Sequence, residues 1–185
     1  MKIVNGYEIK PEANLQAADL RSANLHGADL SNANLVGADL RGADLREANL
    51  QGANLECAKL KDANLRDANL RGANLWSAYL NKADLRGANL EGANLDLAEV
   101  EDANLEGANL QYANLQYANL ENVFFRGANL KVASLEGAKL KGAYLDEADL
   151  GGVNLRLANF WVADLRGANL EGANLKGANF LDADL

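Results

Sequence analysis

The chain contains very few of the residues from which disulfide frameworks and metal sites are built. It has one cysteine, Cys57, and one histidine, His26. A single thiol excludes an internal disulfide framework, and His26 has no second imidazole or thiol with which to share a metal ion. No apolar run is long enough to span a membrane, and the N-terminus lacks the apolar core of a signal peptide. We therefore expect a cytoplasmic protein without a metal, a cofactor or a membrane contact.

The sequence is instead dominated by one five-residue motif. Counting in steps of five from Leu15, all 35 centres up to Leu185 are apolar, and 31 of them are Leu. The exceptions are Val100, Phe125, Phe160 and Phe180. Ala stands two residues before the centre in 33 of the 35 repeats, and Asn or Asp stands directly before it in 28. Since nothing breaks this register, we predict one domain over residues 11–185.

A period of five fits neither a helix nor a flat strand. An α-helix turns about 100° per residue, so Leu at every fifth position would spiral around its axis. In a strand, an odd period would send successive Leu side chains to opposite faces. Each Ala-Asn-Leu triplet reads instead as a short straight side that points in, out and in. The two residues that follow must then turn a corner.

Glycine indicates the type of this corner. It fills the second corner position in 15 of 34 corners, which predicts a type II turn with a positive φ at that position. Val132 and Val162 occupy the same position. Because a β-branched residue would be strained there, we expect these two corners to adopt another turn type.

Departures from the motif indicate how many sides make one coil. The position before the centre becomes Lys59, Tyr79, Glu99 and Lys139, all separated by multiples of twenty residues. Phe124 and Tyr144 form a second pair twenty apart. Twenty residues are four repeats, so the periodicity predicts a square coil, with residues i and i+20 stacked on one face. It does not fix the handedness of the coil.

Repeats such as ANLEG, ADLRG and ANLQY resemble those of the pentapeptide-repeat proteins, whose motif is A(D/N)LXX. The resemblance covers residues 11–185. It implies an all-β solenoid, a right-handed quadrilateral parallel β-helix with four pentapeptides per coil and about 8.75 coils (175 residues divided by 20). With about 4.8 Å per coil, the rod would be roughly 42 Å long. Leu and Ala would fill the interior, and the recurring Asn is expected to form hydrogen-bonded ladders.

The two ends of the repeat are expected to differ. Residues 1–10 fall out of register and carry Ile3, Val4, Tyr7 and Ile9, so we predict a short extended cap over the first coil. The repeat runs to Leu185 without the capping helix that many family members carry. Because an open stack exposes unpaired backbone, something else is expected to cover that end.

Charge is distributed unevenly along the chain. Residues 1–90 carry 11 basic and 11 acidic groups, whereas residues 91–185 carry 7 and 15. No Lys or Arg occurs between Arg86 and Arg126. The acidic residues of that gap, here called the acidic belt, are Glu91, Asp96, Glu99, Glu101, Asp102, Glu106 and Glu121. Such a belt serves either solubility alone or the docking of a basic partner.

The leading hypothesis is a non-enzymatic scaffold that binds an unidentified protein. Its candidate surface combines charge with exposed aromatic groups, which is typical of interfaces. The residues are Glu99, Glu101, Asp102, Glu121, Tyr112, Tyr117, Phe124 and Tyr144. No enzyme is expected, because catalysis needs clustered and environment-tuned groups, whereas these carboxylates are solvated on a regular lattice.

The family resemblance also implies an alternative. Some pentapeptide-repeat proteins mimic duplex DNA, bind DNA gyrase and protect it from quinolones. Duplex DNA has one charge per about 1.7 Å, so a rod of roughly 42 Å would need about 25 negative charges, whereas this chain has a net charge of −8. Arg46, Arg66 and Arg86 are spaced twenty residues apart and are expected to form an arginine column. Direct nucleic-acid binding is not expected either, because Asp44 and Asp84 project beside Arg46 and Arg86 and neutralise that column, and residues 1–90 have no net charge.

The final repeats predict self-association. Leu157, Trp161, Val162 and Leu181 occupy outward positions near the C-terminal end. Beneath them, Phe160 and Phe180 replace Leu at centres of one face. An exposed apolar patch beside open strand edges favours association, so we predict a homodimer through these C-terminal coils, with a monomer whose end is covered by crystal or solution contacts as the alternative.

Overall fold

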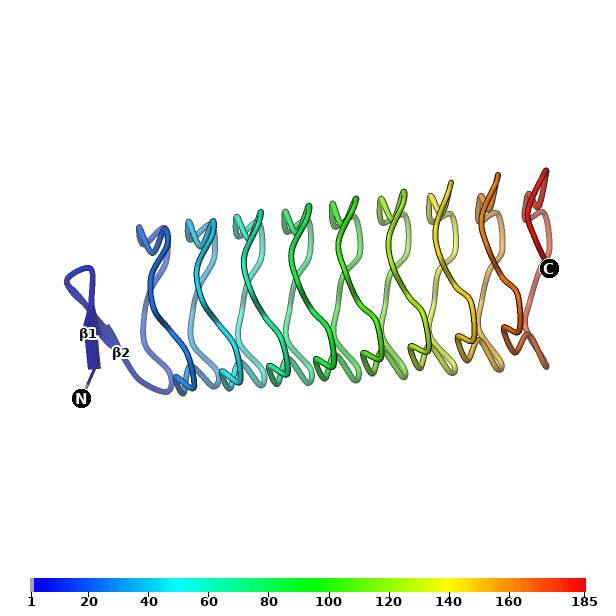
Figure 1. The fold of residues 1–185 in the computed structure, drawn as a ribbon. Coiled ribbons are helices and arrows are strands. Elements are labelled where there is room, and N and C mark those ends of the chain that lie inside the picture. Colours follow the sequence, from blue (N-terminus) through cyan, green and yellow to red (C-terminus); the bar gives the residue numbers. More distant parts are fainter. Residues whose placement is uncertain (1) are drawn as a thin grey trace.

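The computed structural model describes residues 2–185 and shows a straight rod of stacked coils, with the two chain ends at its opposite ends (Figure 1). Residue 1 of the predicted cap lies outside the described residues. Parallel bridges join each residue before a centre to the residue twenty positions further on, from Asn14↔Asn34 to Asp164↔Asp184. One coil is therefore twenty residues, as the periodicity predicts. The right-handed sense of the coil stays a prediction.

The bridges define four faces, which we number in chain order. Face I holds the repeats centred on position 20 and every twentieth residue to 180, and face II those from 25 to 185. Face III holds the centres from 30 to 170, and face IV those from 15 to 175. Face I is opposite face III, and face II is opposite face IV. We call the position before the centre the outward position, and the two positions after it the first and second corner positions.

Nearly every backbone amide within the rod has a defined partner. Around the centre Leu15, Leu15 N donates to Asn34 O (2.7 Å), and Asn34 N donates to Ala13 O (2.9 Å). The amide of the second corner position also donates to a backbone oxygen of the next coil. The amide of the Ala that follows donates to the oxygen of the preceding centre and closes the turn, as in Ala18 N to Leu15 O (3.0 Å). The first corner amide donates to the side chain of the outward residue, as in Gln16 N to Asn14 Oδ1 (3.3 Å). Asn at the outward position therefore completes the hydrogen bonding of each corner.

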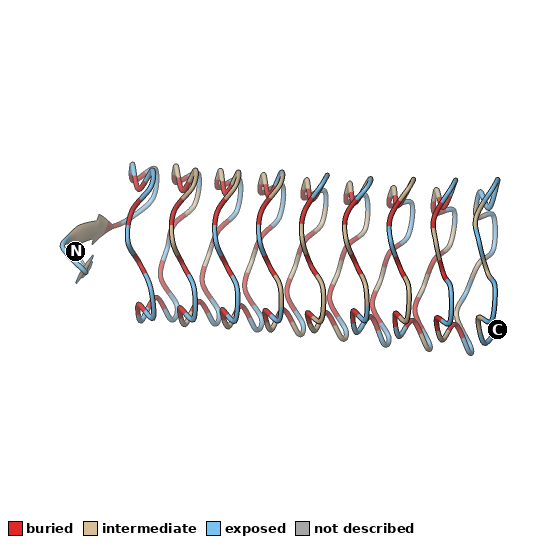
Figure 2. Ribbon diagram, turned by 90° about the horizontal axis from the view of Figure 1, so that it is seen from above, coloured by how far each residue is buried: buried red, intermediate tan, exposed pale blue. Residues whose placement is uncertain are grey.

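The interior contains only the Leu and Ala columns and their apolar substitutes. The side chains of Phe125 and Phe160 are fully buried there. Figure 2 shows buried residues recurring around every coil and giving way to exposed ones in the last coil. In that last coil, among the residues described, the amides of Leu170, Leu175 and Phe180 have no backbone acceptor.

All corners adopt the same backbone geometry, including the two for which the sequence predicted an exception. The second corner position has a positive φ whether it is Gly, as at Gly92 (64°), or not, as at Tyr117 (53°). Val132 (59°) and Val162 (52°) share it, so the prediction of another turn type was wrong. The reason is that each corner is held by a turn bond and a bond to the next coil, such as Val132 N to Gly151 O (3.0 Å). These bonds outweigh the local preference of valine.

The N-terminal segment forms a hairpin. Strand β1 (Lys2–Val4) pairs antiparallel with β2 (Tyr7–Ile9). The turn residues Asn5 and Gly6 both have positive φ (50° and 84°), as a two-residue hairpin turn requires. Ile9 is buried, and Val4 and Tyr7 are partly buried against the end of the core at the first coil. Ile3 is exposed. The Asn-Gly pair in the sequence is the signal for this hairpin.

Candidate interaction surface

Faces III and IV carry ladders of asparagine, interrupted at Asp29 and Asp149 on face III and at Ser134 on face IV. On face IV, the Nδ2 atoms of Asn94 and Asn114 each donate to the Oδ1 atom of the Asn one coil earlier (3.1 Å in both cases). On face III, Asn69 and Asn129 do the same (3.1 Å). The ladder that the sequence predicted is therefore confirmed. Because these side chains are occupied by each other and by the corner amides, faces III and IV offer few free polar groups.

Faces I and II carry arginine–aspartate pairs along part of their length. Arg46 donates from Nε to Asp44 Oδ1 (2.8 Å) and from Nη2 to Oδ2 (2.6 Å), and Asp84 and Arg86 repeat this geometry. The hydrogen bond from Arg46 lowers the pKa of Asp44 to about 2. The prediction that these aspartates neutralise the arginine column is therefore confirmed at these two pairs.

The acidic belt is mostly free of such pairing. Of its members within the described residues, only Glu91 forms an ion pair, with Arg71 (3.2 Å). Glu99 accepts a hydrogen bond from Asn119 Nδ2 (2.9 Å), and Asp102 accepts one from Asn122 Nδ2 (3.3 Å). Their negative charge stays uncompensated. Glu99, Glu101 and Glu121 all belong to face I, with Asp102 at its corner toward face II.

The structure brings only some of the predicted aromatic residues close to these carboxylates. Tyr117 lies at the corner between faces IV and I, beside the acidic residues. Phe124 and Tyr144 stack on face II with ring centroids 4.8 Å apart and planes 2° apart. Tyr112 lies at the corner between faces III and IV, so a whole face separates it from the acidic part of face I. The eight predicted residues therefore do not form one continuous surface.

The predicted C-terminal patch is exposed but partly occupied. Leu157 lies at the corner between faces IV and I, whereas Trp161, Val162 and Leu181 lie at the corner between faces I and II. The ammonium group of Lys141 lies 4.6 Å from the centroid of the Trp161 ring, and Trp161 Nε1 donates to Asp182 Oδ2 (3.3 Å). Contacts within the chain therefore already use part of this indole.

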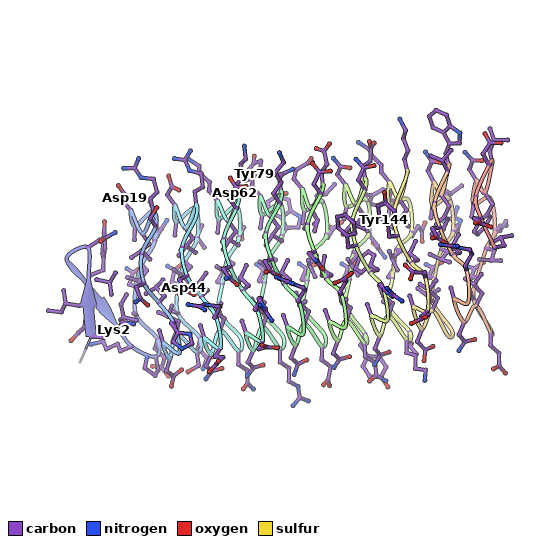
Figure 3. The ribbon with its side chains drawn as sticks, viewed as in Figure 1. Lys2, Asp19, Asp44, Asp62, Tyr79 and Tyr144 are labelled. Atoms are coloured by element: carbon purple, nitrogen blue, oxygen red, sulfur yellow. The ribbon has the colours of Figure 1, made fainter. Side chains whose placement is uncertain are left out.

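The sequence analysis missed a basic and aromatic segment on face I. Arg41, Lys59, Lys61, Tyr79 and Asn81 line a shallow recess of about 220 Å³. The Tyr79 side chain is 48% exposed, and Figure 3 shows it near the same edge of the rod as Asp19 and Asp62. The signal was present in the outward column with its twenty-residue spacing, but we used that column only to count the sides of the coil.

Comparison with known proteins identifies the family. The family model for pentapeptide repeats matches the chain in 8 copies, over residues 11–35, 23–62, 58–96, 98–127, 125–161 and 154–185. The chain belongs to the pentapeptide repeat family. No curated protein matches it significantly.

Two solved pentapeptide repeat structures illustrate how far the likeness extends. A trypsin-treated form of QnrB1, a plasmid-mediated fluoroquinolone resistance protein, superposes with a TM-score of 0.75 over 92% of this chain and 86% of its own, at 22% identity. At that identity the match shows the fold alone. HetL, a pentapeptide repeat protein involved in heterocyst differentiation regulation in the cyanobacterium Nostoc, is 36% identical over 91% of this chain and 90% of its own. Its TM-score is 0.30, so the likeness to HetL is one of sequence.

The remaining polar candidates of this pentapeptide repeat protein are isolated. Cys57 is half-buried at a corner, and the His26 ring Nδ1 lies 3.0 Å from the backbone oxygen of Arg46. Within residues 2–185, no group of three or more His, Cys, Asp and Glu side chains could hold a metal ion. The described part of the chain also has no helix that is long and apolar enough to cross a membrane.

Proposed function

We propose that this pentapeptide repeat protein is a non-enzymatic cytoplasmic scaffold that binds a protein partner through the acidic part of face I. The observation that carries the proposal is the uncompensated charge of Glu99, Glu101, Asp102 and Glu121 in a molecule whose other carboxylates are often paired. Such a surface steers and binds a basic partner. Tyr117 at the adjoining corner, together with Phe124 and Tyr144 around the next one, adds apolar contact area.

The rest of the surface supports a scaffold rather than a catalyst. Within the described residues, pKa values are shifted mainly at Arg–Asp and Lys–Asp pairs, as at Asp39 beside Arg41 and Asp149 beside Lys131. In each case the cation stabilises the ionised carboxyl, which lowers its pKa. Neither carboxyl is poised to take up or release a proton near neutral pH, as general acid–base catalysis requires.

A charge-reversed variant tests the proposal. The variant replaces Glu99, Glu101 and Glu121 by Lys, and a control of equal charge change replaces Glu12, Glu47 and Asp67 by Lys, outside the belt. Each is immobilised and compared with the wild type for the proteins retained from native lysate. We expect the wild type and the control to retain a common protein that the belt variant loses. Identical retention by all three would contradict the proposal.

The aromatic part of the surface needs its own variant. Phe124→Ala with Tyr144→Ala removes the stacked pair on face II without touching the interior, because both side chains are exposed. Weaker retention of the same protein would support a surface that extends from face I to face II. If this variant retains the same protein as strongly as the wild type does, the binding surface is limited to the carboxylates of face I.

The alternative function is mimicry of DNA toward gyrase. Its support is the fold match to QnrB1 together with the acidic belt. The net charge of −8 argues against it, because a duplex of similar length carries far more charge. A supercoiling assay with purified gyrase, with and without the protein and a quinolone, tests it. No effect at micromolar protein would remove this alternative.

We also propose a homodimer through the C-terminal coils. Its support is the exposure of Leu157 (53%), Val162 (46%) and Leu181 (62%) around the partly exposed Trp161. Exposed apolar side chains that gather at one end favour association. Light scattering of Trp161→Glu against the wild type tests this contact, since the side chain lies outside the Leu core. A mass near 20 kDa for the wild type at every concentration would end the proposal.

A further inference from the structure

We propose that face I binds face I of a second copy of this chain, antiparallel, around a two-fold axis that passes beside Tyr79. The inference deepens the proposed function, because it uses the same carboxylates and assigns them a specific occupant. It is carried by the order of charges along face I.

The charges of face I change sign on either side of Tyr79. One coil before it stand Lys59 and Lys61, and one coil after it stand Glu99 and Glu101. None of these four side chains forms an ion pair within the described residues of its own chain. The coil of Tyr79 itself carries no charge at its outward and first corner positions, which are Tyr79 and Asn81.

The pattern continues outward from Tyr79 at equal distances. Two coils before its coil, Arg41 occupies the first corner position, and two coils after it Glu121 occupies the same position. Three coils away in each direction, the outward positions hold Asp19 and Lys139. Face I therefore carries, at matching distances from one coil, groups of opposite sign.

A two-fold axis converts this order into intermolecular pairs. An axis that lies in the contact plane and runs across the face turns the second copy end for end, while each column stays opposite itself. With the axis at Tyr79, Lys59 then faces Glu99 of the second copy, and Lys61 faces its Glu101. Arg41 faces Glu121, and Asp19 faces Lys139, although Arg41 and Asp19 are also paired within their own chain, with Asp39 and Arg21 (2.6 Å each). Each of these four pairs occurs twice, because the contact is two-fold.

The centre of the contact is apolar and hollowed. The two Tyr79 rings meet at the axis, and the outward and first corner positions of that coil, Tyr79 and Asn81, carry no charge. The recess of about 220 Å³ beside Tyr79 is lined by Arg41, Lys59, Lys61 and Asn81, so it receives acidic or aromatic side chains of the second copy. An aromatic anchor at the centre with charged groups around it is the usual arrangement of a protein interface.

Other registers of the same face match less well. A parallel contact, with its axis along the rod, would set the central outward column against itself, so that Lys59 meets Lys59 and Glu99 meets Glu99. An antiparallel axis one coil later would set Glu99 against Glu99. An axis two coils later pairs Glu99 with Lys139 and Glu101 with Lys141, but it sets Glu121 against itself. The register at Tyr79 has the most opposite pairs and no charge on the axis in these two columns.

Like charges do meet at the edges of the proposed contact. Arg21 faces Lys141, although each has a partner in its own chain, Asp19 for Arg21 (2.6 Å) and the Trp161 ring for Lys141. In the second corner column, Lys82 faces itself and Asp62 faces Asp102. These positions lie at the rim, where water and salt screen the repulsion. The contact is consequently a weak one that depends on ionic strength.

Two charge variants test the pairing directly. One carries Lys59→Glu and Lys61→Glu, and the other carries Glu99→Lys and Glu101→Lys. Each variant alone would place like charges opposite each other on face I, so each should be a monomer once Trp161→Glu has removed the separate C-terminal contact. An equimolar mixture should form a heterodimer, because every altered group then faces its opposite. Sedimentation at low salt measures all four samples, including the wild type, with circular dichroism and melting curves to show that both variants are folded.

We expect a wild-type dimer at about 20 mM salt whose dissociation constant rises about tenfold by 0.5 M, where the Debye length is only about 4 Å. A wild type that stays monomeric at low salt and high concentration would overturn the inference, and so would a mixture that forms no heterodimer. Neither result would affect the lysate comparison, so failure here and failure of the proposed function are distinguishable. Trp161→Glu, added to both variants, should leave the heterodimer intact, because Trp161 belongs to the separate C-terminal contact.

A cross-link tests the position of the axis. Tyr79→Cys in a Cys57→Ser background should form a disulfide between two copies on mild oxidation, because the two positions meet at the axis. Asn109→Cys on the opposite face III, in the same background, is the control and should not cross-link. Cross-linking at Glu121→Cys but not at Tyr79→Cys would show the axis two coils later and would overturn the proposed register.

Discussion

Faces III and IV differ from faces I and II in their outward columns, although all four faces share one interior. Face IV reads Asn at every outward position except Ser134, and neighbouring side chains bond along the rod, as from Asn74 to Asn54 (3.0 Å). Face I reads Lys59, Tyr79 and Glu99 over three consecutive coils. The interior therefore does not determine what the outward column contains.

The departures weaken the corners at which they occur. Each outward Asn or Asp that has a residue two positions further on accepts a hydrogen bond from that residue's amide, as at Asp96 N to Asn94 Oδ1 (3.3 Å). Within the described residues, the amides of Lys61, Asn81 and Glu101 donate no such bond to a side chain, because Lys59, Tyr79 and Glu99 precede them. Face I thus gives up stabilising bonds for side chains that are available to a partner.

The largest expected effect concerns the interior, where a substitution should lower the unfolding free energy by a similar amount under every face. Leu80 lies under Tyr79 on face I and Leu90 lies on face III, and both are fully buried. Truncation of either to Ala should lower the free energy of unfolding by about 2–5 kcal/mol, from lost burial and the cavity left behind. Denaturant unfolding of both variants measures this. A loss at only one of the two faces would contradict a uniform interior.

The next largest effect concerns the outward positions, where a substitution should lower the unfolding free energy more on face IV than on face I. Asn94 donates to Asn74 and accepts from both Asn114 and the Asp96 amide, at 3.1–3.3 Å. Asn94→Ala should therefore cost about 1–3 kcal/mol of unfolding free energy, since half-buried partners lose their bonds. Tyr79→Ala, which removes no side-chain hydrogen bond within the described residues, should cost less than about 0.5 kcal/mol. Equal losses of unfolding free energy for the two variants, measured by denaturant unfolding, would contradict this difference between face IV and face I.

A glycine at the corner between faces IV and I provides a smaller contrast. A Cβ added at Gly137 would lie 2.6 Å from the Tyr117 ring, whereas one added at Gly92 meets nothing within 4 Å. Both glycines have positive φ (68° and 64°), so Ala at either carries the backbone strain of about 1 kcal/mol. Gly137→Ala should cost about 1 kcal/mol more than Gly92→Ala, because the ring must move. Adding Tyr117→Ala should abolish this difference in unfolding free energy.

The repeat predicted most of the fold because each of its positions has one structural task. Leu and Ala fill the interior, Asn bonds the corner, and the twenty-residue spacing of unusual residues gives the square coil. The turn at Val132 was mispredicted because a local preference was weighed without the bonds to the next coil. The hairpin at residues 2–9 lies outside the repeat, so its Asn-Gly turn had to be recognised separately.

The candidate surface was predicted less well than the fold. Spacing along the chain placed Tyr112 close to the acidic belt, but in a four-sided coil a few residues lead to another side of the rod. Tyr79 was overlooked for the opposite reason, since it is distant in sequence from Glu99 and adjacent to it in space. A surface on this fold has to be read in steps of twenty residues, which join the positions that are neighbours along one face.

The smallest expected effect distinguishes the aspartate pairs of faces I and II from the neutral asparagine of the other faces. The side-chain hydrogen bond from Arg46 lowers the pKa of Asp44 to about 2, and that from Arg21 lowers the pKa of Asp19 to about 2. An unfolded Asp titrates near 3.9. Because the folded pKa is the lower one, the stabilisation is complete above about pH 4 and is lost as the pH falls through about 2.

Unfolding midpoints should therefore decline between pH 4 and pH 2 even where the Leu core is intact. Asp44→Asn isolates one pair, because the amide Oδ1 atom can still accept the Arg46 amide, as outward Asn does elsewhere, while the charge is gone. This variant should be slightly less stable than the wild type at pH 7 and should approach it at pH 2. Asp19 is exposed and Asp44 is half-buried at the surface, so screening by solvent keeps the effect small. A constant difference between variant and wild type across pH 2–7 would show that the charge of Asp44 contributes nothing beyond the hydrogen bond that Asn also makes.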